Sequence, residues 1–357
     1  MCMVEGRPFR GKELERLKDF LAEMELEYDE GIEYSVCILD EDYRIIATGS
    51  VEGNVLKCIA ISPSCQGQGL AGTILSQLMQ YEFQQGRSHI MIYTKPQNQE
   101  MFESLGFHTI IRTGDVLFME NHLQGFDRFL GKLQHETPEA ARKKPGGGII
   151  GAIVANCNPF TLGHRYLLEE ALKQCQWLHL FVLSDDRTYF KASERFEMVK
   201  DSVADLDRVI LHETSQYIIS AATFPTYFMK EKVHARKANC RLDLELFSNR
   251  IGPELGITRR FVGTEPNCMV TGCYNEMMKE LLPQKGIQVV EILRKEVDGV
   301  PISASVVRAV LEKIRGISGQ CAGGYSDEIS KYMEELRRMV PESTYRYLCN
   351  YLSASLP

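Results

Sequence analysis

The sequence has no apolar run that approaches the roughly 20 residues required by a membrane-spanning helix, so no membrane partner is expected. It also lacks an excess of basic residues. The 48 Asp and Glu residues outnumber the 41 Lys and Arg residues and give a formal charge of −7. Nucleic-acid binders present strongly basic faces to phosphate backbones, so no nucleic-acid partner is expected either. Any groups that bind phosphate must therefore be local.

Disulfide and zinc patterns are also missing. The 11 cysteines are odd in number, include no C-x-x-C pair, and follow no signal-peptide pattern at the start of the chain. The closest pair, Cys268 and Cys273, would need two further ligands at suitable spacing to bind zinc, and we find none. We therefore expect a cytoplasmic protein with reduced thiols and no metal site built from its own side chains.

The first third of the chain predicts an α+β domain. The pattern at 11–27 predicts an amphipathic helix with Leu14, Leu17, Phe20, Leu21 and Met24 on one face. The β-rich runs at 34–40, 44–51 and 54–62 predict an antiparallel meander. A glycine-rich turn then opens a helix, followed by a strand at 89–94, a short helix running into a strand, and a last strand at 117–121.

The second part alternates between strands and helices, which predicts a doubly wound parallel sheet covered on both faces. The strands are expected at 149–155, 178–183, 209–211, 260–263 and 288–292, and the helices at 165–174, 193–206, 241–251, 274–282, 303–315 and 327–352. Between the two parts, a short apolar helix at 126–133 precedes a charged, breaker-rich stretch that ends in three glycines. We therefore place a first domain at 1–125, a linker at 126–148 and a second domain at 149–357.

The stretch "NCNPFTLGH", Asn156–His164, lies between the first strand of the second domain and the next helix. Asn158 and Pro159 end the strand, and Gly163 allows a ligand to approach the backbone closely. The free amides of a helix start attract anions, and His164 and the Thr161 hydroxyl can both donate to a phosphate oxygen there. A lone histidine near a helix start usually caps and packs, but the complete strand, motif and helix favour an anion site.

This stretch resembles the T/H-x-G-H signature of the nucleotidyltransferase superfamily. Its members have Rossmann-like α/β domains of the HUP type that transfer adenylyl or cytidylyl groups. Many members have a glycine and a phenylalanine where this chain has Ala155 and Cys157, which indicates a particular subfamily.

The companion signature of that superfamily, I-S-x-[ST]-x-x-R, is matched by Ile302, Ser303, Ser305 and Arg308. Ser303 is a good helix N-cap, Ser305 can offer its hydroxyl and amide to phosphate, and the Arg308 guanidinium can reach back toward the helix start. Alone, this pattern is typical of an ordinary capped helix. Together with the first motif it predicts that two helix starts bind one triphosphate from both sides.

Further ATP-site candidates follow the other predicted strands. Lys191 and Arg195 can contact nucleotide phosphates or the second substrate, but they can equally be solvated residues at a helix start. Gly263, Thr264 and Glu265 follow the fourth predicted strand of the sheet, at the carboxyl edge where open α/β sheets bind ligands, and are candidates for adenine or ribose contact.

In the first domain, "CQGQGLAG" places Gln66, Gly67, Gly69, Ala71 and Gly72 between a strand and a helix. This loop, with the later "NQEMFESLGF", resembles the GNAT acetyltransferase superfamily, whose loop amides hold the pyrophosphate of coenzyme A. Tyr93 and Glu103 are possible acid or base groups by position only. A binding module without acetyltransferase activity is therefore an open alternative.

The combination of both domains is similar, along essentially the whole chain, to the citrate lyase ligase family. "NCNPFTLGHRYLLEEAL", "RRFVGTEP", "PISASVVR" and the terminal "VPESTYRYL" carry the resemblance. It implies that acetate and ATP, with Mg²⁺, give acetyl adenylate and pyrophosphate. The acetyl group then passes to the thiol of the dephospho-CoA-derived prosthetic group on the acyl carrier subunit of citrate lyase. Within this resemblance His164, Thr161 and Arg308 are the catalytic candidates.

Two other functions stay open at this point. One is an adenylyltransferase that acts on a nucleotide or on a phosphopantetheine-type substrate. The other is a GNAT enzyme that acetylates an amine, with the second domain as a regulatory nucleotide-binding domain.

Overall fold

The computed structural model describes residues 1–142, 148–186, 188–218, 232–264, 269–297, 299–318 and 327–355. The chain forms two compact units. The first comprises Met1–Arg128 and Phe224–Leu246, and the second comprises Phe129–Thr223 and Phe247–Pro357. The stretch Phe224–Leu246 thus groups with the first unit, although the predicted boundaries place it in the second domain.

The predicted linker begins as a regular helix. Helix α4 (Gly125–Glu136) is amphipathic and buries Phe126, Phe129, Leu130 and Leu133. The short apolar helix expected there is confirmed and extends three residues further. Residues 143–147 of the predicted linker lie outside the described residues.

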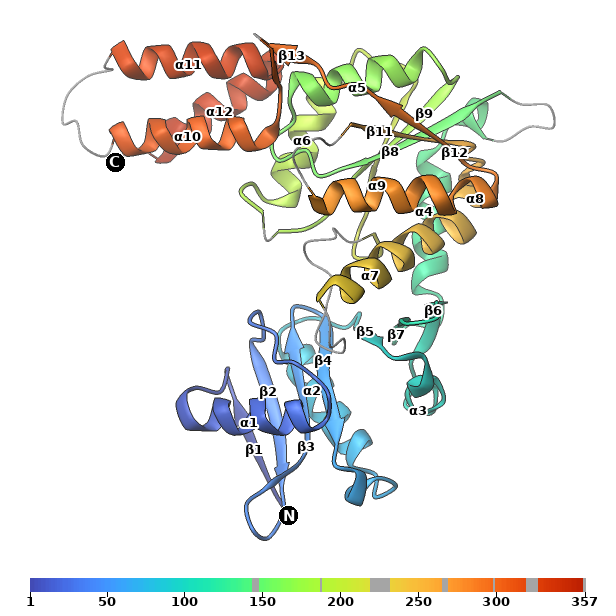
Figure 1. Ribbon diagram of the computed structural model, residues 1–357, viewed down its shortest axis with the longest axis vertical. Helices are drawn as coiled ribbons and strands as arrows, with labels where there is room; N and C mark the ends of the chain where they lie inside the picture. Colours follow the sequence, from blue (N-terminus) through green and yellow to red (C-terminus); the bar gives the residue numbers. More distant parts are fainter. Residues whose placement is uncertain are drawn as a thin grey trace. The chain divides into compact units, whose positions relative to one another are not determined.

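The first unit contains a seven-stranded sheet in the order β1-β2-β3-β4-β5-β7-β6 (Figure 1). Its elements are β1 (Cys2–Gly6), α1 (Gly11–Glu23), β2 (Tyr34–Leu39), β3 (Ile45–Glu52), β4 (Val55–Ile61), α2 (Leu70–Gln84), β5 (Met91–Thr94), α3 (Gln99–Ser104), β6 (His108–Arg112) and β7 (Leu117–Glu120). The antiparallel meander β2-β3-β4 is confirmed. Strand β1, which we did not predict, pairs antiparallel with β2 at the sheet edge.

Strands β4 and β5 are the one parallel pair in this sheet, and their ladder is short. The register joins Val55 to Met91 and Leu56 to Ile92, and no further pair of the two strands follows in the described chain. Strand β4 continues to Ile61 and leads into the "CQGQGLAG" loop, so this loop lies beyond the point where the ladder between the two strands ends.

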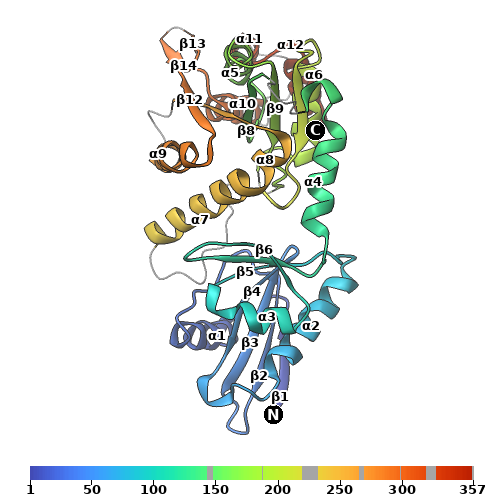
Figure 2. The same ribbon diagram turned by 90° about the vertical axis from the view of Figure 1, so that its right-hand side faces the viewer.

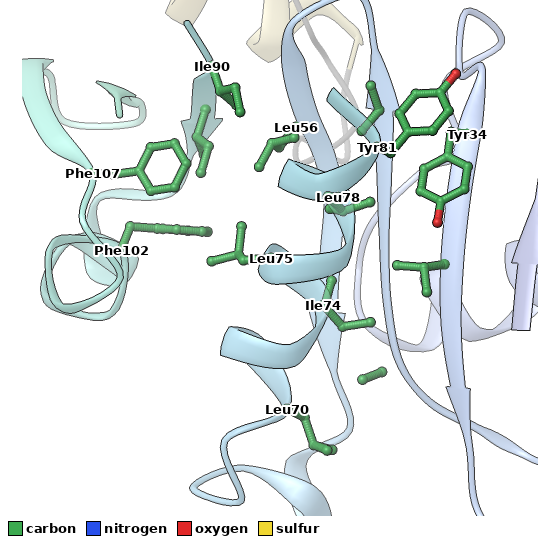
Figure 3. Close-up of a cluster of buried hydrophobic side chains, with 14 of the residues drawn as sticks. Tyr34, Leu56, Leu70, Ile74, Leu75, Leu78, Tyr81, Ile90, Phe102 and Phe107 are labelled. Carbon is green, nitrogen blue, oxygen red and sulfur yellow. The ribbon is translucent and has the colours of Figure 1, made fainter. Parts of the chain in front are cut away.

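Helix α2 packs on the sheet through Ile74, Leu75 and Leu78, which are almost fully buried (Figure 3). A side chain at Gly49 of β3 would lie 2.5 Å from Ile74 and 2.8 Å from Leu78, so only glycine permits this close approach. At one end of this core the rings of Tyr34 and Tyr81 stack with centroids 4.1 Å apart.

The second unit is built on a five-stranded sheet in the order β10-β9-β8-β11-β12, and every pair is parallel. The strands are β8 (Ile150–Ala155), β9 (Trp177–Val182), β10 (Val209–Glu213), β11 (Arg259–Gly263) and β12 (Gln288–Ile292). The predicted doubly wound sheet is therefore confirmed, with the strand order reversing at β8. Open α/β sheets bind ligands beyond the carboxyl ends of the strands at such a reversal.

Helices cover both faces of this sheet. On one face, α5 (Leu162–Leu172) and α6 (Ala192–Ser202) pack on alternating apolar residues that include Ile153, Leu180 and Phe261. The other face carries Phe181 and buried polar residues. It is covered by the end of α4 and by Phe247, which lies in the π-helical turn (Phe247–Ile251) after α7 (Lys232–Leu246). Helices α8 (Gly252–Leu255) and α9 (Met269–Leu281) precede and follow β11.

Three helices end the chain and group together in Figure 1. These are α10 (Ala304–Ser318), α11 (Asp327–Met339) and α12 (Glu342–Ser355), which share a core with Phe190 and Ile302. The predicted helical tail is thus two helices, because Pro341 cannot continue the first one. A small hairpin, β13 (Glu296–Val297) and β14 (Val300–Pro301), joins β12 to α10 (Figure 2).

Candidate functional site

The turn after β8 is fixed by a reciprocal cap. Thr161 is the N-cap of α5, and its hydroxyl accepts a hydrogen bond from the His164 N–H at 3.3 Å. In return, the Thr161 N–H donates to Nδ1 of His164 at 3.0 Å. A histidine therefore has the part that Glu or Gln has in an ordinary capping box. The cap fixes the orientation of the imidazole ring.

The same hydrogen bonds define the tautomer of His164. Because a backbone N–H donates to Nδ1, the proton of the neutral ring lies on Nε2. Nε2 makes no hydrogen bond to the described part of the chain. Burial lowers the pKa of His164 to about 4, and the positive charge of Arg294 contributes. The ring is therefore a neutral donor through Nε2–H at neutral pH.

The start of α10 is capped as the sequence predicted. The Ser303 hydroxyl accepts from the Val306 N–H at 3.3 Å and lies 2.8 Å from the Ser305 hydroxyl. Ser303 is half-buried and Ser305 is exposed. The first amides of this helix thus lie beside two hydroxyl groups, an arrangement that suits an anion.

The two motifs meet at the carboxyl edge of β8. A Cβ on Gly163 would lie 2.9 Å from the Ile302 carbonyl oxygen, so the second motif passes directly over this glycine. Arg308 donates from Nη1 to the Asn158 carbonyl oxygen at 2.5 Å. Burial lowers the pKa of Arg308, and the described chain contains no acidic side chain paired with it. The site therefore combines two helix starts, a neutral imidazole donor and a guanidinium.

Arg195 has a different place from the one the sequence suggested. Its side chain is fully buried and donates to the carbonyl oxygens of Phe190, Asn156 and Asp185 and to the Asn156 side chain, at 2.6 to 3.2 Å. The interpretation of Arg195 as a solvated residue at a helix start is thus wrong, because its side chain is fully buried. Its contact with phosphate or with the second substrate stays a prediction, and the hydrogen bonds to backbone carbonyls favour a structural role instead. Arg195 joins the loop after β9 to the turn after β8.

Asn158 and Thr161 are also engaged within the protein. Asn158 is 6% exposed, and its side-chain oxygen accepts from the Phe190 N–H at 3.1 Å. The Thr161 side chain is 1% exposed and lies against His164. These contacts favour a positioning role for both residues. Lys191 is exposed at the start of α6, and its contact with phosphate stays a prediction.

The end of β11 contributes backbone groups. The Thr264 N–H donates to the Ile292 carbonyl at 3.0 Å, and the Thr264 carbonyl accepts from Nε of Arg294 at 2.7 Å. Gly263 accepts from the Asn275 side chain at 3.2 Å, and Glu265 lies outside the described residues. Contact of Gly263 and Thr264 with adenine or ribose stays a prediction.

Our sequence analysis did not consider Arg294. It follows β12 closely, at the same carboxyl edge as His164 and Thr264. The signal was available in the sequence, because the carboxyl-edge rule that selected Gly263 applies equally to the residues after the strand predicted at 288–292.

The loop in the first unit has the conformation that its glycines allow. Gly67 and Gly69 have φ values of 77° and 75°, and Gly69 is the N-cap of α2. Gln66 is exposed, whereas Ala71 and Gly72 are half-buried. Tyr93 is buried against Phe118, and the Glu103 carboxylate accepts from Gln99 and Thr109.

The donors of the second unit fit a nucleotide tail better than a bare metal ion. In the described ranges, no group of three or more His, Cys, Asp and Glu side chains is arranged to hold a metal. None of the helices described is long and apolar enough to cross a membrane.

Comparisons with known proteins match two parts of the chain to two family models. A model of the GNAT acetyltransferase domain matches residues 7–121, and a model of the citrate lyase ligase C-terminal domain matches residues 150–318. The citrate (pro-3S)-lyase ligase of Klebsiella pneumoniae is 43% identical over 311 residues, which are 86% of this chain and 87% of that protein. The corresponding ligase of Haemophilus influenzae is 38% identical over 94% of this chain and 95% of that protein. That of Escherichia coli is 36% identical over 96% and 92%.

Proposed function

The chain belongs to the citrate lyase ligase family, and from this premise we propose that it is an ATP-dependent ligase that acetylates a thiol on the acyl carrier subunit of citrate lyase. The observation that supports this most directly is the meeting of the two helix starts at Gly163 and Ile302. The phosphates of ATP suit this place, because it offers the free amides of two helix starts, the imidazole N–H of His164 and the guanidinium of Arg308.

We propose the following reaction. A carboxylate oxygen of acetate attacks the α-phosphorus of ATP, the bond from this phosphorus to the β-phosphate oxygen breaks, and pyrophosphate leaves. A thiolate on the partner then attacks the acetyl carbonyl, a thioester forms, and AMP leaves. Both steps need alignment and stabilisation of negative charge, which fixed donors supply.

Each residue has a definite part in this proposal. His164 donates through Nε2–H to the β- and γ-phosphates, and Thr161 holds the ring in that orientation. Arg308, Ser303 and Ser305 bind the same phosphates from the side of α10. Mg²⁺ would be held chiefly by ATP oxygens and would neutralise their charge, because the described residues supply no acidic cluster for it.

ATP–pyrophosphate exchange tests the function. Acetate should drive exchange in the purified full-length protein, and H164A,R308A should abolish it. Exchange driven by a phosphate monoester instead of acetate would indicate an adenylyltransferase. Absence of exchange, together with acetylation of an amine by acetyl-CoA, would indicate a GNAT enzyme.

For the first unit, we propose that the loop from Gln66 to Gly72 binds the pyrophosphate of the partner's CoA-derived prosthetic arm. Exposed amides around two left-handed glycines support this role. G67D should weaken acetyl transfer to the carrier and leave acetate-dependent exchange unchanged. G67N is the matched control, because asparagine tolerates positive φ and has the same size as aspartate but no negative charge. Equal transfer by both variants at wild-type affinity would contradict the proposal.

A further inference from the structure

Phe190 connects the turn after β8 to the helices at the end of the chain. Its side chain is fully buried and belongs to the core shared with α10, α11 and α12. Its backbone N–H donates to the side-chain oxygen of Asn158 at 3.1 Å, and its carbonyl accepts from Nε of Arg195 at 3.2 Å. The ring of Phe190 is therefore held by the C-terminal helices, while its backbone is bonded to the turn that contains the first motif.

Helix α12 packs aromatic rings against Phe190. The Tyr347 ring meets the Phe190 ring edge-on with centroids 6.2 Å apart, and the Tyr351 ring, one helical turn further on, lies at 5.0 Å. The Ser343 hydroxyl of the same helix lies 2.7 Å from the Ser202 hydroxyl at the end of α6. Tyr347 and Ser343 belong to the terminal "VPESTYRYL" pattern, which the reaction proposed above does not use. This pattern thus contacts both α6 and the loop that precedes it.

The hydroxyl of Tyr347 has a different neighbour from its ring. Burial raises the pKa of Tyr347, and the interaction of its hydroxyl with the Glu194 carboxylate raises it further. Glu194 in turn accepts a hydrogen bond from the Lys191 N–H at 2.7 Å, at the N-cap of α6. Because the ring and the hydroxyl have separate contacts, substitutions can separate their effects.

Asn158 connects Phe190 to the phosphate-binding donors. Its side chain accepts from the Phe190 N–H, and its own carbonyl accepts from Nη1 of Arg308 at 2.5 Å. An electrostatic interaction also connects Arg308 with Tyr189, the residue before Phe190. A shift of Phe190 would therefore move Asn158 and Arg308 together. Where binding groups must be aligned for reaction, a displacement of about 1 Å can cost roughly 100-fold in rate.

We propose that Tyr347 is a positioning residue for the ATP site. Its ring holds Phe190, and the hydrogen bonds from Phe190 to Asn158 and from Arg308 to Asn158 keep the guanidinium in the orientation that the phosphates need. This inference rests on the proposed function for the identity of the nucleotide. It gives the terminal pattern a part in the reaction that does not require contact with the substrates.

ATP–pyrophosphate exchange and calorimetric titration with ATP, both on the full-length protein well below its melting transition, test the proposal. Y347A should lower kcat/KM for ATP in acetate-driven exchange by roughly 10- to 100-fold and weaken ATP binding by roughly tenfold. Y347F keeps the ring and should behave like the wild type. Y345A is the matched control, because Tyr345 is also a half-buried tyrosine of α12 but packs beside Arg337 of α11, whose guanidinium lies 5.5 Å from the ring centroid. It should keep the wild-type values.

A double-mutant cycle with N158A separates positioning from a general loss of stability. N158A removes the acceptor of the Phe190 N–H, so Y347A should lower exchange little further in that background. If Tyr347 acted only on stability, the losses from the two substitutions would multiply. Multiplying losses would therefore overturn the proposal.

Three other outcomes would also overturn it. They are unchanged exchange and ATP affinity in Y347A, equal losses in Y347A and Y345A, and a loss in Y347F as large as that in Y347A. The last of these would assign the effect to the hydroxyl and Glu194 instead of the ring. If Y347A does not fold, Y347L replaces it with the same expected and contrary results, because leucine fills much of the space but has no aromatic ring.

The failure of this inference differs from the failure of the proposed function. A wild-type protein that binds ATP but shows no acetate-driven exchange would refute the ligase proposal, and the ATP affinities of Y347A and Y347F would still decide the role of Tyr347. Acetate-driven exchange in the wild type and equal exchange in Y347A would refute the role of Tyr347 alone. A wild-type protein that does not bind ATP would refute both.

Discussion

Substitution of Arg195 by methionine should destabilise the second unit. The guanidinium is fully buried and donates to three backbone carbonyls and one side-chain oxygen. Methionine keeps much of the volume but leaves these acceptors without their donors. Removing one side of a buried charged network costs about 3–5 kcal/mol. At roughly 2–4 °C per kcal/mol for a domain of this size, the melting transition should fall by roughly 10 °C.

Scanning calorimetry of the full-length protein measures this loss, and titration with ATP well below the transition measures binding. K191M is the control at the start of the same helix, α6. Lys191 is exposed, so its loss should change the free energy of unfolding by less than about 0.5 kcal/mol. If R195M melted like the wild type while its ATP affinity fell tenfold or more, Arg195 would be a phosphate ligand and the structural role described above would be refuted.

The remaining predictions concern the turn after β8 and two histidines with lowered pKa values. G163A places a methyl group 2.9 Å from the Ile302 carbonyl, which should cost about 1–3 kcal/mol and weaken ATP binding in titration, whereas G131A, with open space around its Cβ, should bind ATP normally. Because the pKa of His164 is lowered to about 4, its NMR signal, identified by its loss in H164Q, should not titrate between pH 8 and 5.5. A midpoint near 6.5 would contradict the lowered pKa of His164. Burial lowers the pKa of His179 to about 3 and that of His164 to about 4, so both histidines bind protons in the unfolded chain before they do in the folded one. The free energy of unfolding should therefore be highest above about pH 6.5. Below that pH it should fall by up to about 1.4 kcal/mol per pH unit for each histidine. Urea titrations from pH 7.5 to 5 measure this slope, and a slope that H164Q leaves unchanged would contradict the contribution of His164.

The sequence was sufficient for the order of most elements and for the position of the two motifs at helix starts. Strand and helix periodicity reflects which face of a short segment is buried, and the alternation after residue 149 was therefore readable as a parallel sheet. The cap at Ser303 was readable for the same reason, because a helix start is defined by hydrogen bonds within three or four residues. The cap at Thr161 was not predicted. The motif pair thus predicted two anion-binding helix starts at one edge of the sheet.

The roles of individual polar side chains were decided by contacts between distant segments. The sequence left Arg195 open between contact with phosphate or substrate and a solvated position at a helix start, but carbonyls from two other loops surround it in the fold. Arg294 was passed over, yet the chain that follows it is hydrogen-bonded to the segment over Gly163. Short-range periodicity determined which elements form. Tertiary packing alone decided which buried donors form hydrogen bonds to backbone carbonyls and which lie at the carboxyl edge of the sheet. The reason is that a buried polar group must form hydrogen bonds with the groups that the fold places beside it.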